Sequence, residues 1–563
     1  MLTFARINRN IRSISRYRTI LGILIKYGFG HFIEQLNINY YLELGRRLVT
    51  LGSAPKEIER LTQPERLRLA IEELGPTFIK FGQILSTRPD LLPREYIDQF
   101  SKLQDTIPAL PFDSIRGQID EGLGRPTDEV FAEIVATPIA AASIAQVHKA
   151  RLHGGEEVVV KVRRPGIERI IETDLDILMG LAYLAENHLP VMETYDPCGL
   201  VREFRRTIFR ELDFKREGHT IDRFASNFEG DPNVCIPEVF WDCSCETVLT
   251  MEYVDGLKIS DMEELEARGH DLKKLAATGA DFFLKQVLVH GFFHGDPHPG
   301  NFFVRPDEKI CLLDFGMVGR LDEDLKMQLV DLLVAVLERD ADRIISQLLY
   351  RGDLLDEVNH RMLKRDLAEF IDDYYDLPLQ SINVGKMVME FVDILSIYRI
   401  KFPSDLMLLA KALVTMEGIG RQLDPEFNMI GHLQPFLEKV VRDRMTPASF
   451  SKEALRLLHA YGALAKNLPR DLKEFVNRVN RNQFKIDLEH RGLEKLINDL
   501  DKSSNRVSFS LIISALIVGS SLIMQTEKGP MLFGFPILGI LGYTIAAVLG
   551  LWLAIAILRS GRL

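Results

Sequence analysis

Apolar positions along the chain change their spacing, and each change predicts a different kind of structure. Between about residues 55 and 105 they recur at helical spacing, as in LRLAIEELGPTFIKFGQIL. Between about 128 and 163 short β-branched runs, SIAQVHKARL and EEVVVKVRR, lie on either side of the turn signal HGG at 153–155. This segment predicts a hairpin with Lys161 near the end of its second strand.

The rest of the long middle region is predicted to be mainly helical. Helices are expected at about 167–188 and 198–225, and strands in VCIPEVFWD and ETVLTMEYVDG. From there to about residue 500 the chain is mostly helical, interrupted by HGDPHPGNFFV and KICLLDFGMVG, each a loop beside a short apolar strand. Helices, a small sheet and a larger helical lobe in this order predict an α+β fold.

Two uncharged runs lie near the C-terminus. Val507–Met524 has eighteen residues and Phe533–Leu558 has twenty-six, and each is long enough to cross a hydrocarbon core of about 30 Å. The short connector QTEKGPML makes them a hairpin, and a buried soluble hairpin is the alternative. Basic residues lie outside both runs, so the positive-inside rule predicts that both ends face the cytoplasm.

Composition and charge narrow the classes of function. The formal net charge of −11 argues against a nucleic-acid partner, because no overall positive field is there to neutralise phosphates. The five cysteines lack a CxxC pair, which favours a reducing compartment and ordinary strand cysteines at Cys243 and Cys245 rather than a metal site. Residues 1–20 hold five arginines and no acid, so this end is either a lipid-contacting segment or a solvated helix leading into the domain.

Three motifs occur in the order in which a protein kinase uses them. Lys161 in VVVKV sits like the strand lysine that pairs the phosphates of a nucleotide. Asp296 precedes Asn301 by five positions, the spacing of a kinase catalytic loop, and Asp314 begins the sequence DFG. In this interpretation Asn301 and Asp314 hold Mg²⁺, and Asp296 orients or deprotonates an attacking hydroxyl or water.

The loop HGDPHPGN has two other interpretations. His294 and His298 are four residues apart, as in a zinc site, but two prolines prevent the regular helix that would put both on one face. A purely structural turn would not require Asp and Asn at the spacing of a metal-binding pattern. The sequence therefore favours a catalytic loop.

Two departures from an ordinary protein kinase change the expected chemistry. The glycine-rich loop before Lys161 is replaced by TPIAAASIAQV, and alanine restricts the close backbone approach that glycine permits, so the triphosphate should be held differently. After the DFG sequence the chain continues straight into a helix without an activation segment that ends in Ala-Pro-Glu. A platform for docking a peptide substrate is therefore not expected.

The motifs KFGQ, AAAS, ELDFKRE, HGDPHPGN and DFG together resemble the UbiB family of atypical kinases, the AarF and ADCK group associated with coenzyme Q biosynthesis. The resemblance covers about residues 60 to 450. It implies an atypical protein-kinase-like bilobal fold with an N-terminal helical extension and two C-terminal transmembrane helices. The implied parts are a basic N-terminal segment (1–55), the helical extension with the KxGQ motif (56–125), an N-lobe (126–256), a helical C-lobe (257–500) and a transmembrane hairpin (507–558).

The resemblance also assigns site residues. The KxGQ helix covers the place where a kinase receives its protein substrate. Its Lys80 meets the acidic ExD motif, which is Glu211 and Asp213 here. Glu217 is then the partner of Lys161. Glu211 and Glu217 lie about 240° apart on a helix, which predicts two separate ion pairs. The resemblance implies ATP or ADP with Mg²⁺, an alanine-rich turn at the phosphates, and a hinge in MEYVDG whose backbone meets the adenine. The resulting site comprises Lys80, Gln83, Ala140, Ala141, Ala142, Ser143, Lys161, Glu211, Asp213, Glu217, Glu252, Val254, Asp296, Asn301 and Asp314.

The function implied is that of a membrane-anchored kinase or ATPase that supports isoprenoid quinone biosynthesis by acting on or extracting a lipid intermediate. Its expected partners are a lipid or quinone precursor, the membrane and other quinone biosynthetic enzymes, and its expected location is the bacterial inner membrane. Two alternatives stay open: a protein kinase that phosphorylates a partner protein, and a nucleotide-sensing scaffold without turnover. A direct hydroxylase is not favoured, since the sequence has no dinucleotide-binding turn.

Overall fold

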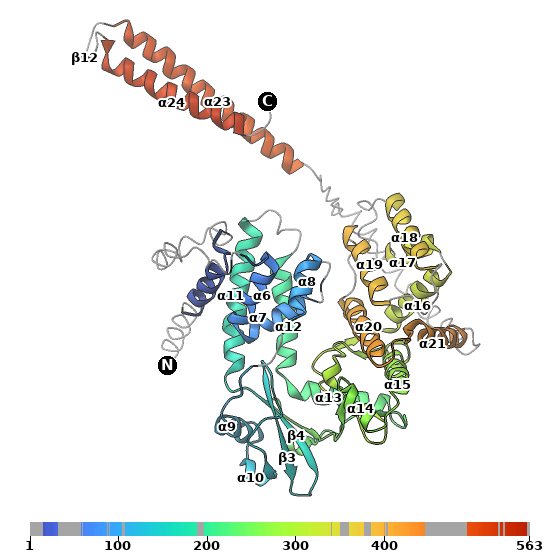
Figure 1. The fold of residues 1–563 in the computed structure, drawn as a ribbon. Helices are drawn as coiled ribbons and strands as arrows, with labels where there is room; N and C mark the ends of the chain where they lie inside the picture. The colour runs from blue at the N-terminus through green and yellow to red at the C-terminus, as the bar shows by residue number, and fades with distance from the viewer. Residues whose placement is uncertain are drawn as a thin grey trace, which may run out of the picture. The chain divides into compact units, whose positions relative to one another are not determined.

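The computed structural model describes residues 15–31, 58, 60–86, 88, 91–103, 107–188, 196–338, 340–349, 360–375, 384–398, 400, 404–444, 493–526, 530–532 and 535–559. These residues belong to two compact units, Met1–Ser449 and Phe450–Leu563. The predicted boundaries at residues 55, 125 and 256 stay predictions. The α+β content expected from the sequence is confirmed (Figure 1).

The first unit begins with a helical extension, which the apolar spacing predicted. Gly75, with φ of 99°, separates its first two helices, and Pro76 starts the second. Two later helices pack on this extension, and the apolar faces of all of them share one core. The helices of this group are α6 (Gln63–Leu74), α7 (Pro76–Leu85), α8 (Arg94–Phe100), α11 (Ile167–His188) and α12 (Pro197–Glu211).

Part of the basic N-terminal segment packs against this extension. Ile20 is buried, and the guanidinium of Arg16 pairs with the buried carboxylate of Asp174 at 2.7 Å. The Tyr27 hydroxyl donates to Glu73 at 2.8 Å. The described residues 15–31 therefore lead into the domain, while the arginines at positions 6, 9 and 12 lie outside the described residues.

A five-stranded antiparallel sheet follows, in the order β1-β3-β4-β6 with β2 paired to β3. Its hairpin is the one predicted from the sequence, with Lys161 opposite Val147 and Leu249. Alternate residues of β4 are buried against α9 (Phe112–Leu123), so Lys161 faces the other side of the sheet. The strands are β1 (Phe131–Ile134), β2 (Ala140–Ala141), β3 (Ala145–Leu152), β4 (Glu157–Arg163) and β6 (Val248–Glu252).

The helix predicted at 198–225 is wrong in one respect, because the chain forms two helices there. α12 ends at Glu211, and α13 runs from Phe214 to Asn227. Asp213 has an extended conformation (φ −97°, ψ 93°) and accepts a hydrogen bond from the Lys215 amide, so it is the N-cap of α13. Asp213 therefore separates α12 from α13.

The second lobe combines short strands with long helices. A four-stranded sheet has the order β5-β10-β9-β7, and β8 pairs with β11. Within the stretch VCIPEVFWD, Val234 and Cys235 pair with β10 in this second sheet, whereas Val239 forms a single bridge to Met251 of β6 in the first sheet. The strands are β5 (Val234–Cys235), β7 (Leu257–Lys258), β8 (Phe292–His294), β9 (Phe302–Val304), β10 (Ile310–Leu312) and β11 (Val318–Arg320).

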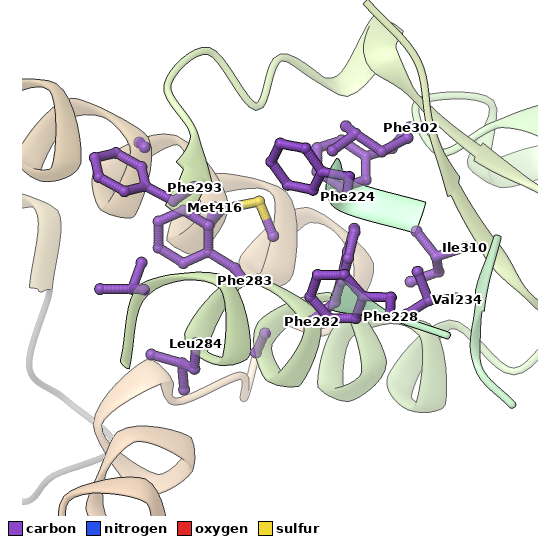
Figure 2. Close-up of a cluster of buried hydrophobic side chains, with 14 of the residues drawn as sticks. Phe224, Phe228, Val234, Phe282, Phe283, Leu284, Phe293, Phe302, Ile310 and Met416 are labelled. Atoms are coloured by element: carbon purple, nitrogen blue, oxygen red, sulfur yellow. The ribbon is translucent and has the colours of Figure 1, made fainter. Parts of the chain in front are cut away.

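A phenylalanine-rich core joins these strands to the helices (Figure 2). Phe224 from α13 contacts Phe292 and the DFG residue Phe315 at ring-centroid distances of 5.1 and 5.0 Å. Burial of such rings is worth about 1.5–3 kcal/mol each. The helices of this lobe are α14 (Met262–Ala267), α15 (Leu272–Leu284), α16 (Glu323–Leu337), α17 (Ala341–Leu349), α18 (His360–Tyr375), α19 (Val384–Ile397), α20 (Ser404–Leu423) and α21 (Met429–Arg444).

In the second unit two long apolar helices pack against each other, as the hairpin prediction required. They are α23 (Leu493–Met524) and α24 (Ile537–Arg559), joined through the short strands β12 (Met531–Leu532) and β13 (Phe535–Pro536). A side chain at Gly542 would meet the Ser520 hydroxyl, so glycine permits the close approach. Segments Ser503–Met524 and Ile537–Ala554 have mean hydropathies of 2.2 and 2.1 and are long enough to cross a membrane.

Candidate functional site

Lys161 lies at the centre of the candidate site, between two carboxylates. Its Nζ is 2.7 Å from Glu217 Oε1 on α13 and 3.1 Å from Asp314 Oδ1 at the end of β10. Burial alone would lower the pKa of Lys161, but the two carboxylates raise it above its ordinary value. Lys161 in turn holds the pKa of Asp314 well below its usual range, so Asp314 is ionised at neutral pH. Glu217 is buried, and burial raises its pKa against the effect of Lys161.

The loop HGDPHPGN is anchored by His294 at the end of β8. The Asp296 amide donates to His294 Nδ1 at 3.2 Å, so the ring proton is on Nε2 and is donated to the Asp314 carbonyl at 2.5 Å. Burial lowers the pKa of His294, which keeps the ring neutral. In the same loop His298 Nδ1 accepts from the Gly300 amide at 3.1 Å. Both rings therefore brace the loop, which favours the catalytic-loop interpretation over a shared zinc ion.

The same loop places Asp296 and Asn301 next to Asp314. The side-chain amide of Asn301 donates to the backbone carbonyl of Asp296 at 3.3 Å. The backbone carbonyl of Asn301 accepts from the backbone amide of Leu313 at 2.8 Å. Asp314 has a φ of 61°, a conformation that is costly for a residue other than glycine and is often found at functional sites. The residues predicted from the kinase-like motifs thus converge in one place.

One charged residue of this site, Lys411, was not predicted from the sequence. It lies on α20, 115 residues after Asp296, and its Nζ is 3.1 Å from Asp296 Oδ1. Burial alone would raise the pKa of Asp296, but Lys411 outweighs this effect and the net shift is downward. Asp296 is therefore a carboxylate at neutral pH with a cation beside it. The apolar pattern of α20 places Lys411 on a helix, but no motif connects it with the loop.

The KxGQ helix, α7, reaches the site through Lys80. Lys80 Nζ is 3.4 Å from Glu211 Oε1, and its charge also helps to lower the pKa of Asp314. Two separate ion pairs, Lys80–Glu211 and Lys161–Glu217, are thus formed as predicted, although the two glutamates lie on different helices. Gln83 makes a different contact from the one expected of a site residue, because its side-chain amide donates to the Leu103 carbonyl at 3.2 Å.

The alanine-rich turn is held from behind by the arginine after β4. Arg164 is buried, and its guanidinium donates to the Ala142 carbonyl at 2.8 Å and to the Pro108 carbonyl at 2.9 Å. The Ala141 carbonyl accepts from the Ile107 amide at 3.3 Å. Among the described residues the buried Ser143 hydroxyl has no hydrogen-bond partner. The turn is therefore fixed to the segment that follows the helical extension, unlike a free glycine loop.

The predicted hinge connects the two sheets, because β6 ends at Glu252 and β7 begins at Leu257. Val254 is buried. A side chain at Gly256 would come within 2.8 Å of the Val304 carbonyl oxygen of β9, so the close approach of these two segments requires glycine.

The donor atoms suit a magnesium–nucleotide complex. Mg²⁺ prefers hard oxygen ligands, and Asn301 and Asp314 offer an amide and a carboxylate. The Asp314 carboxylate is ionised, and its side chain is 56% exposed, so it is accessible to a ligand. Lys161 supplies a cation on the same side. Asn301 and Asp314 would therefore hold the metal, and Lys161 would contact the phosphates.

Comparisons with known proteins agree with this geometry. Family models match the ABC1 atypical kinase-like domain at residues 102–348, the UbiB helical domain at 367–428 and the ABC1/UbiB kinase-like C-terminal domain at 491–559. A probable protein kinase UbiB from Marinobacter nauticus is 34% identical over 85% of this chain and 88% of its own length. Another, from Xanthomonas campestris pv. campestris, is 33% identical over 90% and 93%.

An uncharacterized protein in the hydrogenase 1 5' region of Clostridium pasteurianum is 36% identical over 98% of this chain and 100% of that protein. These matches extend over nearly the whole chain, and they confirm the kinase-like fold and the resemblance seen in the motifs. The chain belongs to the UbiB family of ABC1 kinase-like proteins.

Proposed function

We propose that this protein is a membrane-anchored atypical kinase or ATPase that binds Mg²⁺ with ATP or ADP and supports isoprenoid quinone biosynthesis. The observation that carries the proposal is the convergence of Lys161, Glu217, Asn301 and Asp314 with the Asp296–Lys411 pair. These groups come from five separate segments, and together they provide the parts that phosphoryl transfer needs.

Each group has a role in this chemistry. Lys161, fixed by the buried Glu217, would bind phosphate oxygens, and bound Mg²⁺ would neutralise their charge. Asp296 is ionised, so it can accept a hydrogen bond from an attacking hydroxyl or water and orient that oxygen. Lys411 beside it would stabilise the negative charge of the transferred group, which is the role that cationic residues have in phosphoryl transfer.

The acceptor is proposed to be a lipid-like quinone precursor or water. The two apolar helices of the second unit would anchor the chain in the bacterial inner membrane with the kinase-like domain in the cytoplasm. The sequence lacks an activation segment, and the KxGQ helix contributes Lys80 to the site, which argues against a peptide acceptor. Other quinone biosynthetic enzymes are the proposed protein partners.

Asp296→Asn tests the proposal, because it removes the charge while keeping the size of the side chain. In the full-length protein purified in detergent we expect Mg²⁺-dependent nucleotide hydrolysis to fall about 10²–10⁴-fold. Quinone content should fall in cells that carry only this variant. The exposed Asp98 on α8 provides a matched control, and Asp98→Asn should leave both measurements unchanged.

Three outcomes separate the alternatives. Normal quinone content with the folded Asp296→Asn protein would contradict an enzymatic role and favour the nucleotide-sensing scaffold. Stoichiometric phosphate on a partner protein, lost in Asp296→Asn, would favour the protein kinase. Unchanged hydrolysis in the variant would exclude Asp296 from the reaction.

A further inference from the structure

A pair of cysteines lies in the second sheet. Neither cysteine has a role in the proposed function. Cys235 on β5 and Cys311 on β10 are direct neighbours in a parallel strand pair. Neighbouring strands lie about 4.7–4.9 Å apart, which is within the range of about 4.4–6.8 Å between Cα atoms that a disulfide spans. Side chains of residues paired across neighbouring strands lie on the same face of a sheet. The two sulfur atoms therefore face each other.

The two sulfurs differ in their access to solvent. Cys311 is fully buried, whereas Cys235 is partly exposed and lines a surface cavity of about 270 Å³. Arg305 and Lys309 line the same cavity. The Arg305 guanidinium donates to Cys235 Sγ at 3.4 Å. A small oxidant can thus reach the Cys235 sulfur, which lies beside the Arg305 guanidinium. The Cys311 sulfur is buried next to Cys235 and is not accessible from solvent.

Electrostatics favours the thiolate at the exposed position. The neighbouring Cys311 thiol and the Arg305 guanidinium outweigh burial and lower the pKa of Cys235 to about 6. The pKa of Cys311 is raised by the neighbouring Cys235 and by burial. At pH 7 Cys235 is therefore ionised to a greater extent than a thiol with the ordinary pKa of about 8.5, of which about 3% is thiolate.

Cys198 and Cys243 lack this combination. The pKa of Cys198 is raised to about 11 by a hydrogen bond with Glu186 and by burial. Burial raises the pKa of Cys243. Cys243 therefore offers an internal reference for an ordinary, less reactive thiol in the same protein.

We propose that Cys235 and Cys311 form a peroxide-sensitive dithiol, with Cys235 as the attacking sulfur and Cys311 as the resolving thiol. The Cys235 thiolate attacks one oxygen of hydrogen peroxide, the O–O bond breaks, and the leaving hydroxide takes a proton to become water. The Cys235 sulfenic acid is then attacked by Cys311, which loses its proton as the S–O bond breaks and a second water leaves. Two sulfurs are oxidised by one electron each, and peroxide is reduced to two waters.

The position of the pair links its redox state to the kinase-like site. Cys311 lies on β10, three residues before Asp314, which follows the end of that strand, and Cys235 follows α13, which carries Glu217. Arg305, which contacts the Cys235 sulfur, also lies 3.6 Å from the Glu252 carboxylate at the hinge. A disulfide would fix β10 to β5 and remove the negative charge that Arg305 faces.

The proposal is tested with the full-length protein in detergent, reduced, desalted and treated with hydrogen peroxide. After the remaining thiols are blocked with N-ethylmaleimide, peptide mass spectrometry should show a Cys235–Cys311 disulfide with Cys243 still a blocked thiol. In Cys311→Ser, dimedone should label a sulfenic acid at Cys235. In Cys235→Ser, neither a disulfide nor a sulfenic acid should form at Cys311, and Cys243→Ser should behave like the wild type.

A rate measurement on the wild-type protein needs no substitution. The proposal can therefore be tested even if one of the variants fails to fold. At pH 7 we expect N-ethylmaleimide to react with Cys235 about tenfold faster than with Cys243, and Arg305→Met to reduce that ratio. Equal rates for the two cysteines, or no Cys235–Cys311 disulfide after peroxide treatment, would overturn the proposal. Because the readout is independent of nucleotide turnover, either result leaves the proposed kinase or ATPase activity untouched.

Discussion

Replacing Lys161 by methionine should destabilise the kinase-like unit more than an ordinary surface substitution does. The change removes the cation that lies 2.7 Å from Glu217 and 3.1 Å from Asp314 and keeps most of the apolar stem. Glu217 has a side chain only 6% exposed, so its charge would be left buried and unpaired. Removing one partner of a buried ion pair costs about 3–5 kcal/mol, and we expect a loss of this size in the free energy of unfolding.

The pH dependence of the free energy of unfolding provides a second, independent test of whether Glu217 is left buried and unpaired in Lys161→Met. Without Lys161, burial raises the pKa of Glu217 further above its ordinary value of 4.5. Between the unfolded and folded pKa values the folded state then binds more protons than the unfolded state, so stability falls as pH rises through this window. The deficit of Lys161→Met relative to wild type should therefore shrink as pH is lowered from about 8 towards 5.

Urea unfolding of the full-length protein in detergent measures both effects. The control is Lys149→Met on the neighbouring strand, since Lys149 pairs with the exposed Glu157 at 3.1 Å and a pair of this kind is worth about 1 kcal/mol or less. In Lys161→Met with Glu217→Gln the buried charge is gone, and stability should partly return. A loss below about 1 kcal/mol, a deficit that does not depend on pH, or no recovery in the double variant would show that Lys161 does not compensate a buried charge on Glu217.

Three further changes test other features. Lys411→Ala should reduce Mg²⁺-dependent nucleotide hydrolysis by about 10- to 100-fold. The free energy of unfolding, measured in urea, should change little, because the ion pair of Lys411 with Asp296 is partly exposed. Ser143→Ala should stabilise the fold by up to about 1 kcal/mol in urea unfolding, since it removes a buried hydroxyl that lacks a partner among the described residues. Gly256→Ala should destabilise the fold by about 1–3 kcal/mol, because the new Cβ would lie 2.8 Å from the Val304 carbonyl oxygen; an unchanged melting temperature would contradict this.

Sequence patterns predicted the parts of this protein whose signal is local. The hairpin that carries Lys161 follows from alternating β-branched residues on either side of a turn, and the pair of long apolar helices near the C-terminus follows from two long uncharged runs. The break at Asp213 was missed because α12 and α13 both have apolar faces at helical spacing, and a cap between them interrupts only two residues. Periodicity averages over such short breaks.

Long-range contacts between charged residues could not be predicted in this way. Lys411 reaches Asp296 because α20 packs on the core of the second lobe, and a lysine on an amphipathic helix is ordinarily solvent-exposed. The Lys80–Glu211 pair was expected only through the family resemblance, since spacing alone does not join residues 131 positions apart. Gln83 shares the face of Lys80 but bonds to the Leu103 carbonyl, so a motif residue supports the helix rather than the charged site.

The arrangement of the three lysines indicates why nucleotide binding should depend on the metal. Lys80, Lys161 and Lys411 come from α7, β4 and α20, and each is paired with a carboxylate of the protein. Phosphates that approach Lys161 must compete with Asp314, a carboxylate whose lowered pKa shows that it is strongly stabilised by that lysine. A divalent cation at Asp314 would satisfy the carboxylate and release Lys161 towards the phosphates, whereas phosphates alone would meet an ion pair that is already complete. We therefore expect the metal and the nucleotide to bind with positive coupling, and the strength of that coupling to depend on Glu217, which keeps Lys161 in place when Asp314 turns to the metal.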